Sequence, residues 1–212
     1  MGFTGFPDEA FEFFAGLAED NSKAYWEANR ATYESTVKGP LQALLDEFEP
    51  EFGTGKIFRI HRDVRFSKDK SPYKTQQGAH AAGGCYLQLD ADGLMVAGGM
   101  YGPSSEQIAR YRAAVDEEKS GQALVAIVGT LRAEGFEIAG EMLKTRPRGV
   151  PDDHPRLELL RHRSLYAHQG WPADPWMRDG PQVLDRVRSA WRKLTPIVEW
   201  GTEHMGGNER LS

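Results

Sequence analysis

Residues 83–101 read GGCYLQLDADGLMVAGGMY, and this stretch decides the fold class of the chain. Apolar and polar side chains alternate as far as Leu89, and a second apolar run begins at Leu94. Between the two runs lies Asp90-Ala91-Asp92-Gly93, whose final Asp-Gly pair supplies the positive φ that a tight hairpin turn needs. The stretch therefore predicts two antiparallel strands joined by a short turn.

Before this hairpin, residues 1–55 have helical patterns. Thr4 or Asp8 can start a first helix, and Asn21 or Ser22 can cap a second one. The second helix has one stripe at spacings of three and four, formed by Trp26, Asn29, Tyr33 and Val37. Lys38-Gly39-Pro40 predicts its end, with a third helix following to about Phe48. With 3 Lys and Arg against 11 Asp and Glu, these residues form an acidic helical arm.

After the hairpin, helices and short strands follow one another. Ser104 opens a helix to about Glu117, and a second helix covers residues 121–133. We expect a short strand and a Pro-containing loop over 136–153, a short helix over 155–161 and a short strand over 164–170. A long helix over 180–204 turns Val183, Leu184, Val187, Trp191, Leu194 and Val198 inward.

These patterns predict an α+β fold, with a mostly antiparallel sheet packed with N-terminal and C-terminal helices. We expect a single domain over 1–212, made of the acidic helical arm (1–55), strands with a basic loop (56–101) and helices with short strands (102–212). A chain of 212 residues can bury a full hydrophobic core without disulfides or metals.

The composition excludes several classes of protein. One cysteine rules out an intramolecular disulfide framework and a cysteine-clustered zinc site. No apolar run approaches the roughly 20 residues that span a bilayer, and the start of the sequence lacks the features of a secretion signal. We therefore predict a cytoplasmic protein with no membrane partner.

The strongest functional signal is RIHRDVRFSKDKSPYK, residues 59–74, which we call the basic segment. From Lys56 to Lys74 there are 7 Lys and Arg against 2 acids, a local charge of +5 in a chain whose formal charge is −5. Local positive charge of this density attracts anions even when the whole surface is acidic.

Period-two alternation runs through residues 57–66 and predicts a strand with a polar face. Phe58, Ile60, Val64 and Phe66 fall on one side, while Arg59, His61, Asp63 and Arg65 fall on the other. Arg62 lies in the apolar register, so we expect a bend or a bulge there. Pro72 ends regular structure, and residues 68–80 are expected to form a long loop.

We interpret the basic segment first as a binding site for a phosphate- or carboxylate-bearing ligand. Guanidinium groups grip such anions bidentately and lysines add point charge. The predicted ligand-binding residues are Arg59, Arg62, Arg65, Lys68, Lys70, Lys74 and Asn29, although a helix-stripe amide such as Asn29 more often has a structural role.

Two alternatives stay open. In the first, the protein is an enzyme of phosphoryl or carboxyl-group chemistry, in which Arg62, Arg65 and Lys70 hold the anion. Asp63 and Tyr73 are then the candidate catalytic residues, with His61 as a further proton carrier. In the second, the protein is a non-catalytic scaffold, in which the basic segment pairs internally with the acidic helices.

Other chemistry has little support in the sequence. Glycine loops that cradle nucleotide phosphates are absent, so we predict no cofactor. Asp152-Asp153-His154, with His162 and His168, is a weak metal candidate, and we predict no metal there. Cys85 alternates with leucines and is expected in the core. An isoelectric point near 5.7 makes nucleic acid an unlikely partner, although a local basic patch leaves one open.

The chain resembles a family catalogued as domain of unknown function 2461, and the resemblance covers almost its whole length. It rests on four blocks: Phe13-Phe14 through Asn21, Lys23, Trp26, Asn29-Arg30 and Tyr33; Arg59, Arg62-Asp63, Arg65-Phe66-Ser67, Asp69-Lys70 and Pro72-Tyr73-Lys74; Gly98-Gly99 with Pro103; and Lys144 through Pro147, Gly149 and His154-Pro155.

This resemblance implies no established activity, substrate or cofactor. The chain departs from the family pattern at two positions. Asp20 stands where many relatives have a second Asn, and His61 stands where an aromatic or amide residue is common. The resemblance therefore gives no support to His61 as an acid or base.

Overall fold

The predicted hairpin is present in the computed structural model, which describes residues 2–65 and 67–206. Its strands are β3 (Cys85–Asp90) and β4 (Gly93–Met100). The Asp90 carboxylate accepts hydrogen bonds from the backbone N–H groups of Asp92 and Gly93, at 2.9 and 3.2 Å. Gly93 has φ +142°, the positive value for which glycine was expected at the turn.

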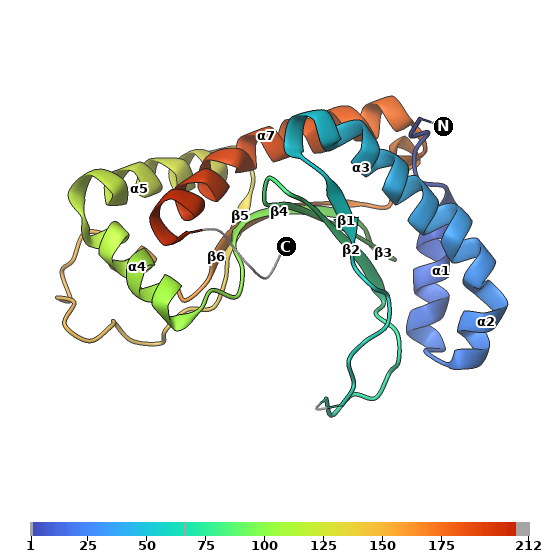
Figure 1. Ribbon diagram of the computed structural model, residues 1–212, viewed down its shortest axis with the longest axis horizontal. Coiled ribbons are helices and arrows are strands. Elements are labelled where there is room, and N and C mark those ends of the chain that lie inside the picture. The colour runs from blue at the N-terminus through green and yellow to red at the C-terminus, as the bar shows by residue number, and fades with distance from the viewer. Residues whose placement is uncertain (1, 66, 207–212) are drawn as a thin grey trace. The chain divides into compact units, whose positions relative to one another are not determined.

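Further strands extend this hairpin into one sheet with the order β1-β2-β3-β4-β6-β5. They are β1 (Gly55–Ile57), β2 (Gln76–Ala81), β5 (Glu137–Ala139) and β6 (Leu165–Pro172). The pairs β1–β2, β2–β3 and β5–β6 are antiparallel. Helices precede and follow these strands along the chain (Figure 1), which confirms the predicted α+β class.

The chain forms two compact units. The first comprises Met1–Val96 and Gly170–Ser189, and the second comprises Ala97–Gln169 and Ala190–Ser212. Strands β4 and β6 and helix α7 (Gly180–Met205) each begin in one unit and end in the other. A single domain over the whole chain stays a prediction.

In the first unit, α1 (Asp8–Glu19), α2 (Lys23–Thr32) and α3 (Gly39–Phe52) build the predicted acidic helical arm. The Ser22 side chain caps α2 by accepting the Tyr25 backbone N–H at 3.1 Å, as the sequence suggested. Helix α1 contacts β3, and α3 contacts β1 and β2. Aromatic side chains from residues 6–48 form a buried core in this unit, which includes Phe6, Phe13, Phe14, Trp26, Tyr33 and Phe48.

These helices cover only one face of the strands in this unit. Along β3, Cys85, Leu87 and Leu89 are fully buried, while the alternating residues are half-buried. The second set, Tyr86, Gln88 and Asp90, shares its face with Gln76, Gly78 and His80 of β2 through the pairing register. The second face of β2 and β3 is therefore polar.

The predicted helix end at Lys38-Gly39-Pro40 is wrong. A π-helical turn, Tyr33–Lys38, joins α2 to α3, and Gly39 continues it with φ −61° and ψ −55°. The Gly39 N–H donates to the carbonyl of Glu34, five residues earlier. Pro40 then lies in the first turn of α3, where a missing N–H leaves no helical hydrogen bond unmade.

The predicted strand over 57–66 and the predicted loop over 68–80 are also corrected. Only Gly55–Ile57 pairs as β1, and Gln76–Ala81 forms β2. Strand β2 lies between β1 and β3 and pairs with both. Its two neighbours therefore hold this segment extended, although the segment has no β-branched or aromatic residue.

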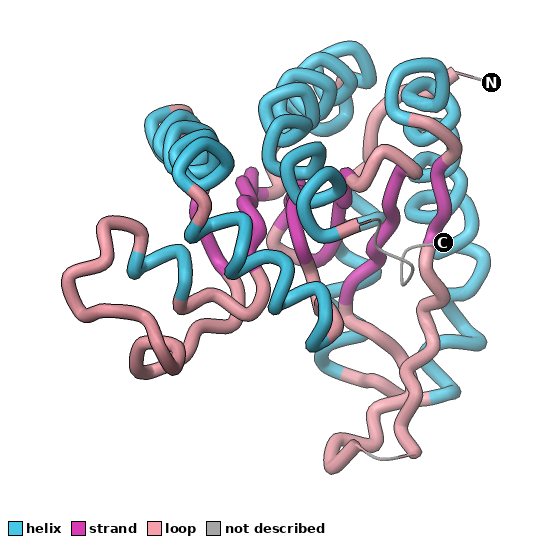
Figure 2. The backbone as a smooth tube through the Cα atoms, turned by 60° about the vertical axis from the view of Figure 1, so that its left-hand side comes forward, coloured by secondary structure: helices cyan, strands magenta, loops and turns pink. Residues whose placement is uncertain are grey.

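In the second unit, the predicted helices are confirmed as α4 (Ser105–Asp116), α5 (Glu118–Ala133) and α6 (Leu157–Leu160). Ser104 and Gln107 form a capping box at the start of α4. The predicted short strands are β5 and β6, and the long closing helix is α7. Figure 2 distinguishes these helices and strands from the loops that join them.

A short 3-10 helix, Pro175–Arg178, precedes α7 in the first unit. Within residues 2–65 and 67–206, no helix combines the length and the apolar character needed to cross a membrane.

Candidate functional site

The basic segment is a two-stranded extension of β1 and β2 in the first unit. His61 and Tyr73 form an antiparallel bridge. The Arg62 N–H donates to the Pro72 carbonyl and the Lys74 N–H donates to the Ile60 carbonyl, both at 2.9 Å. In Figure 1 this part of the chain projects beyond the ends of β1 and β2. The backbone thus brings residues from the two ends of the segment together.

Asn21, at the turn between α1 and α2, attaches this extension to the helices. Its Nδ2 donates to the Tyr73 carbonyl at 3.1 Å, and its Oδ1 accepts the Tyr73 N–H at 3.0 Å. The Tyr73 ring stacks on Trp26 of α2, with centroids 4.9 Å apart and planes 18° apart. The His61 ring makes an edge-type contact with Trp26, with centroids 5.7 Å apart, and a tilted contact with Tyr73, with centroids 5.1 Å apart. The base of the segment is therefore held in a defined position.

The expected polar face is present without a continuous strand. Arg59, His61, Asp63 and Arg65 are exposed, while Ile60 is buried. Arg62, the residue in the apolar register, is half-buried, and its N–H is paired rather than bulged outward. The extra residues lie in the partner strand instead. Between the pairs Ile57–Ala79 and His61–Tyr73, residues 74–78 of that strand lie opposite residues 58–60, so the partner strand is the longer one. Phe66 lies outside the described residues.

The two acids of the basic segment are both paired within the segment. Asp63 accepts bidentate hydrogen bonds from Arg65, at 2.9 Å from Nε and 2.7 Å from Nη2. These bonds hold the pKa of Asp63 below its ordinary value. A carboxylate with a lowered pKa is a weaker proton acceptor, so the geometry favours a structural pairing over base chemistry at Asp63.

Asp69 has a similar environment. Its Oδ1 accepts from the Ser71 hydroxyl at 2.6 Å and from the Ser71 N–H at 2.9 Å, and its Oδ2 pairs with Arg62. The Ser71 hydrogen bonds, with Arg62 as the further cause, lower the pKa of Asp69 to about 2. Some acids of the helical arm pair with cations outside the segment, as in Glu27–Lys23 and Glu51–Arg188.

Four cations of the segment have no acidic partner in the described part of the chain. In residues 2–65 and 67–206, no ion pair is found for Arg59, Lys68, Lys70 or Lys74. Lys70 donates to the Val64 carbonyl at 2.9 Å. Burial, with Arg59 nearby as the second cause, lowers the pKa of Lys74. Arg59 and Lys74 are thus two neighbouring positive charges at the base of the segment.

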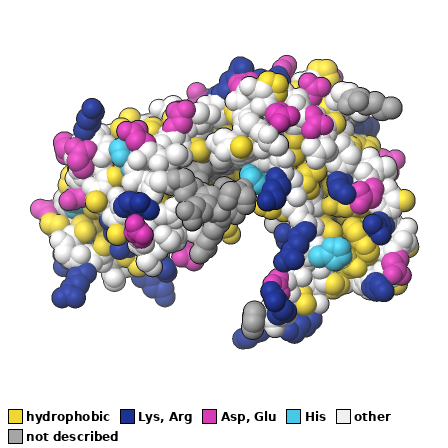
Figure 3. All heavy atoms as spheres, in the orientation of Figure 1, with side chains coloured by type: hydrophobic (Ala, Val, Ile, Leu, Met, Phe, Trp, Pro, Cys, Tyr) yellow, Lys and Arg dark blue, Asp and Glu magenta, His cyan; other side chains and the backbone are white. Residues whose placement is uncertain are grey.

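An aromatic ring lies beneath these charges. Lys74 Nζ is 5.9 Å from the centroid of Phe58, and the His80 ring stacks on Phe58 at 5.2 Å and 25°. Figure 3 shows the dark blue Lys and Arg side chains gathered along the extension of β1 and β2. The arrangement offers positive charge and an apolar surface to one ligand.

His80 belongs to this site and was missed from the sequence. Its Nδ1 lies 3.4 Å from the Ala81 carbonyl, and its Nε2 is buried with no hydrogen-bond partner in the described part of the chain. Burial is the main cause that lowers the pKa of His80 below the ordinary 6.5; the Ala81 carbonyl opposes it and nearby Lys56 adds to it. The lowered pKa favours the neutral ring at pH 7. The pairing of β1 with β2 places His80 beside the basic segment. No sequence motif indicates this position of His80.

The sequence model of one family matches residues 9–200, and its description is conserved hypothetical protein, DUF2461. That range covers most of the chain. The chain belongs to the DUF2461 family. The resemblance noted in the sequence is thereby confirmed. No curated protein and no solved structure shows a significant match to the chain.

The remaining predicted site residues of this DUF2461 chain take the following positions. Asn29 is half-buried in α2, where its Nδ2 donates to the Tyr25 carbonyl at 2.9 Å. Tyr73 is 5% exposed, with its ring against Trp26. The catalytic roles of Asp63 and Tyr73 stay predictions, as does ligand binding by Asn29.

The weak metal candidate of the DUF2461 chain is dispersed in the structure. Asp152 pairs with Arg146, His154 with Asp116, and His162 Nδ1 lies 3.0 Å from the Ser164 carbonyl. His168 lies 3.8 Å from Glu137. Across residues 2–65 and 67–206, no three His, Cys, Asp or Glu side chains are arranged to hold a metal ion. Cys85 is buried as expected, and burial raises the pKa of its thiol to about 12.

Proposed function

We propose that this protein binds an anionic ligand, bearing phosphate or carboxylate, through the basic segment. The observation that carries the proposal is the uncompensated charge of Arg59, Lys68, Lys70 and Lys74. Asp63 and Asp69 already neutralise Arg65 and Arg62, so they cannot also neutralise these four cations. Neighbouring like charges repel each other, and an anion between them relieves that repulsion.

The ligand is expected at the base of the segment, where Arg59 and Lys74 are neighbours. Here the Arg59 guanidinium supplies a planar fork and Lys74 supplies a point charge. The neutral His80 ring and Phe58 form an adjacent aromatic surface. The segment is anchored by Asn21 and Trp26, so little conformational entropy is lost when a ligand binds.

The pairing within the segment favours binding over the two alternatives. A scaffold in which the segment neutralises the acidic helices is not supported by the ion pairs, which join Arg62 and Arg65 to acids of the segment itself. Enzyme chemistry through Asp63 is disfavoured by its lowered pKa. The cytoplasm is the location that we expect, on the sequence grounds given above.

Titration of the full chain with inorganic phosphate and with citrate tests this proposal. We expect binding at 20 mM salt that weakens at 300 mM salt, because added ions screen exposed charges. Arg59→Gln and Lys74→Gln should each weaken binding about tenfold, equivalent to roughly 1.4 kcal/mol. Lys23→Gln is the matched control, since Lys23 is an exposed cation of the same unit that pairs with Glu27.

The outcome is read by calorimetry, with circular dichroism as a check that each variant folds. Equal affinity of the wild type, Arg59→Gln and Lys74→Gln for every anion would refute the proposal. The same holds if Lys23→Gln weakens binding as much as the two site variants, because the effect would then come from the overall charge.

A further inference from the structure

The second unit contains a cavity of about 380 Å³ that lies far along the chain from the basic segment. Its wall is formed by the last two turns of α4, by a loop that precedes α6 and by the end of α6. The lining residues are Arg112, Ala113, Asp116, Pro147, Arg148, Gly149, Val150, Pro151 and Leu160. This volume lies in the range of sites that bind small molecules.

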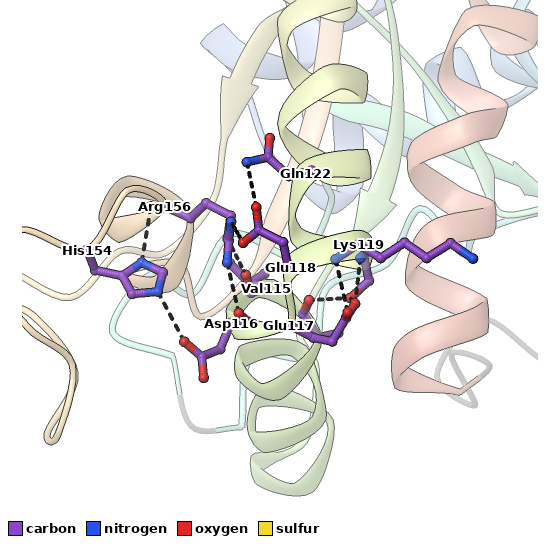
Figure 4. A network of polar contacts seen from close by, with 10 residues as sticks. Val115, Asp116, Glu117, Glu118, Lys119, Gln122, His154 and Arg156 are labelled. Carbon is purple, nitrogen blue, oxygen red and sulfur yellow. Dashed lines mark hydrogen bonds and ion pairs between the residues drawn. The ribbon is translucent and has the colours of Figure 1, made fainter.

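A buried arginine fixes the loop against the end of α4. Arg156 is 5% exposed, and its Nε and Nη2 donate to the carbonyls of Val115 and Asp116 at 2.7 and 2.8 Å. Its Nη1 donates to Glu118 at 2.9 Å. Figure 4 shows the Arg156 guanidinium between the Glu118 carboxylate and this stretch of backbone. The cavity wall is therefore held in place without a ligand.

Asp116 is engaged by His154. The Arg156 N–H donates to His154 Nδ1 at 3.1 Å, so Nε2 carries the ring proton and donates to the Asp116 carboxylate at 3.1 Å (Figure 4). This hydrogen bond orients the Asp116 carboxylate. The same Asp116 side chain belongs to the cavity wall.

A β-turn supplies another part of the cavity wall. The Val150 N–H donates to the Pro147 carbonyl at 3.2 Å, which places Arg148 and Gly149 at the two central positions. Gly149 has φ +86°, as a type II turn requires at its second central position. Arg146 closes the loop by donating to the Val150 carbonyl and pairing with Asp152, both at 2.6 Å. The turn thus places Arg148 in the cavity wall.

Arg112 is half-buried and leaves one of its guanidinium nitrogens without a partner. Its Nε is buried, and no hydrogen bond to that atom is found within residues 2–65 and 67–206. In the same described part, neither Arg112 nor Arg148 has an ion pair. A buried donor left unpaired destabilises the folded state, so an acceptor that reaches Arg112 gains affinity. Two cations and Asp116 give the lining a formal charge of +1.

We propose that this cavity binds a small organic monocarboxylate with an apolar body. The carboxylate takes hydrogen bonds from the guanidinium groups of Arg112 and Arg148, in the bidentate geometry that suits this pair. The apolar body contacts the side chains of Val150, Pro151 and Leu160. A single negative charge matches the lining, whereas the second charge of a phosphate dianion meets the Asp116 carboxylate.

The test uses the full chain with hexanoate and benzoate as probes and with hexanamide and benzamide as neutral matches. We expect the acids to bind and the amides to bind at least tenfold more weakly. Arg112→Met and Arg148→Met should each weaken hexanoate binding at least tenfold. Arg110→Met is the matched control, because Arg110 lies on the same helix but is exposed and pairs with Glu106.

Backbone NMR shifts during the titration locate the bound acid. Shifts centred on Ala113 and Gly149 support the proposal, whereas shifts centred on residues 59–74 place the acid in the basic segment and overturn it. Inorganic phosphate binding more tightly than hexanoate at Ala113 and Gly149 also overturns it. Because Arg148 is exposed, Arg148→Met retains the fold and decides the question even if Arg112→Met does not fold.

Discussion

At the scale of single residues, Asn21 holds the basic segment against the helices, a role that no helix pattern in the sequence indicates. The sequence suggested it only as a possible cap for α2, a role that Ser22 performs. Its side-chain amide instead pairs with both backbone groups of Tyr73, 52 positions later in the chain. The amide thus makes the two backbone hydrogen bonds that a neighbouring strand would otherwise make with Tyr73. This role depends on a distant contact, which a local pattern in one sequence does not encode.

Asn21→Ala should therefore loosen the basic segment. Loss of two hydrogen bonds at a half-buried position should lower the free energy of unfolding by about 1–3 kcal/mol. Urea unfolding measures the loss, and hydrogen exchange should show faster exchange at Arg62 and Lys74. Asn29→Ala is the control, since Asn29 donates only within α2. Equal effects of the two substitutions on exchange at Lys74 would contradict this role for Asn21.

The lowered pKa of Asp69 leads us to expect that the stability of the folded protein depends on pH. Its pKa in the folded protein is about 2, below its ordinary 3.8, so the folded state prefers the ionised carboxylate. The resulting contribution to stability is complete above about pH 4 and is lost as the pH falls towards 2. Ser71→Ala removes the largest cause and should raise the pKa of Asp69 towards 3.8. Carboxyl carbon NMR measures both values, and identical midpoints in the two proteins would refute the assignment.

At the scale of elements, local patterns found some strands and missed another. The β3–β4 hairpin was predictable because alternation, apolar runs and an Asp-Gly turn agree. Helix α4 was predictable because Ser104 caps it. Strand β2 was missed because Gln76–Ala81 consists of residues with weak strand preference, which pairing with β1 and β3 holds extended. The π-helical turn at Tyr33–Lys38 was missed because Gly39-Pro40 ordinarily ends a helix.

The approach of β1 to α3 also predicts a measurable effect. A Cβ at Gly55 would lie 2.7 Å from Leu45 Cβ, and Leu45 is buried. Gly55→Ala should therefore overpack this contact and lower the free energy of unfolding by about 1–3 kcal/mol. Thermal unfolding of the variant measures the change.

Gly129→Ala in α5 is the matched control. No atom lies within 4 Å of an added Cβ there, so relief of glycine entropy should raise the free energy of unfolding by about 0.5–1 kcal/mol. A Gly55→Ala protein as stable as the wild type would show that β1 and α3 are less closely packed than described.

At the scale of the whole molecule, the charge distribution in the sequence indicates where the candidate site lies but not which of its cations are available to a ligand. The sequence places +5 within residues 56–74 of an acidic chain, and this predicted the position of the site. Which cations stay unpaired depends on side-chain geometry, which charge counts do not contain: Arg62 and Arg65 are neutralised locally, whereas Arg59 and Lys74 are not. His80 and Arg112 were missed because each becomes unusual only when the fold buries one of its nitrogens without a partner.

The most direct test of the central claim is the pKa of the Lys74 amine in the full chain, measured by NMR with and without inorganic phosphate. Without phosphate, burial and Arg59 should hold it below the ordinary 10.5, and Arg59→Gln should raise it. Bound phosphate favours the charged amine and should raise the pKa in the wild type. An amine that titrates at 10.5 and does not respond to phosphate would contradict anion binding at the base of the basic segment.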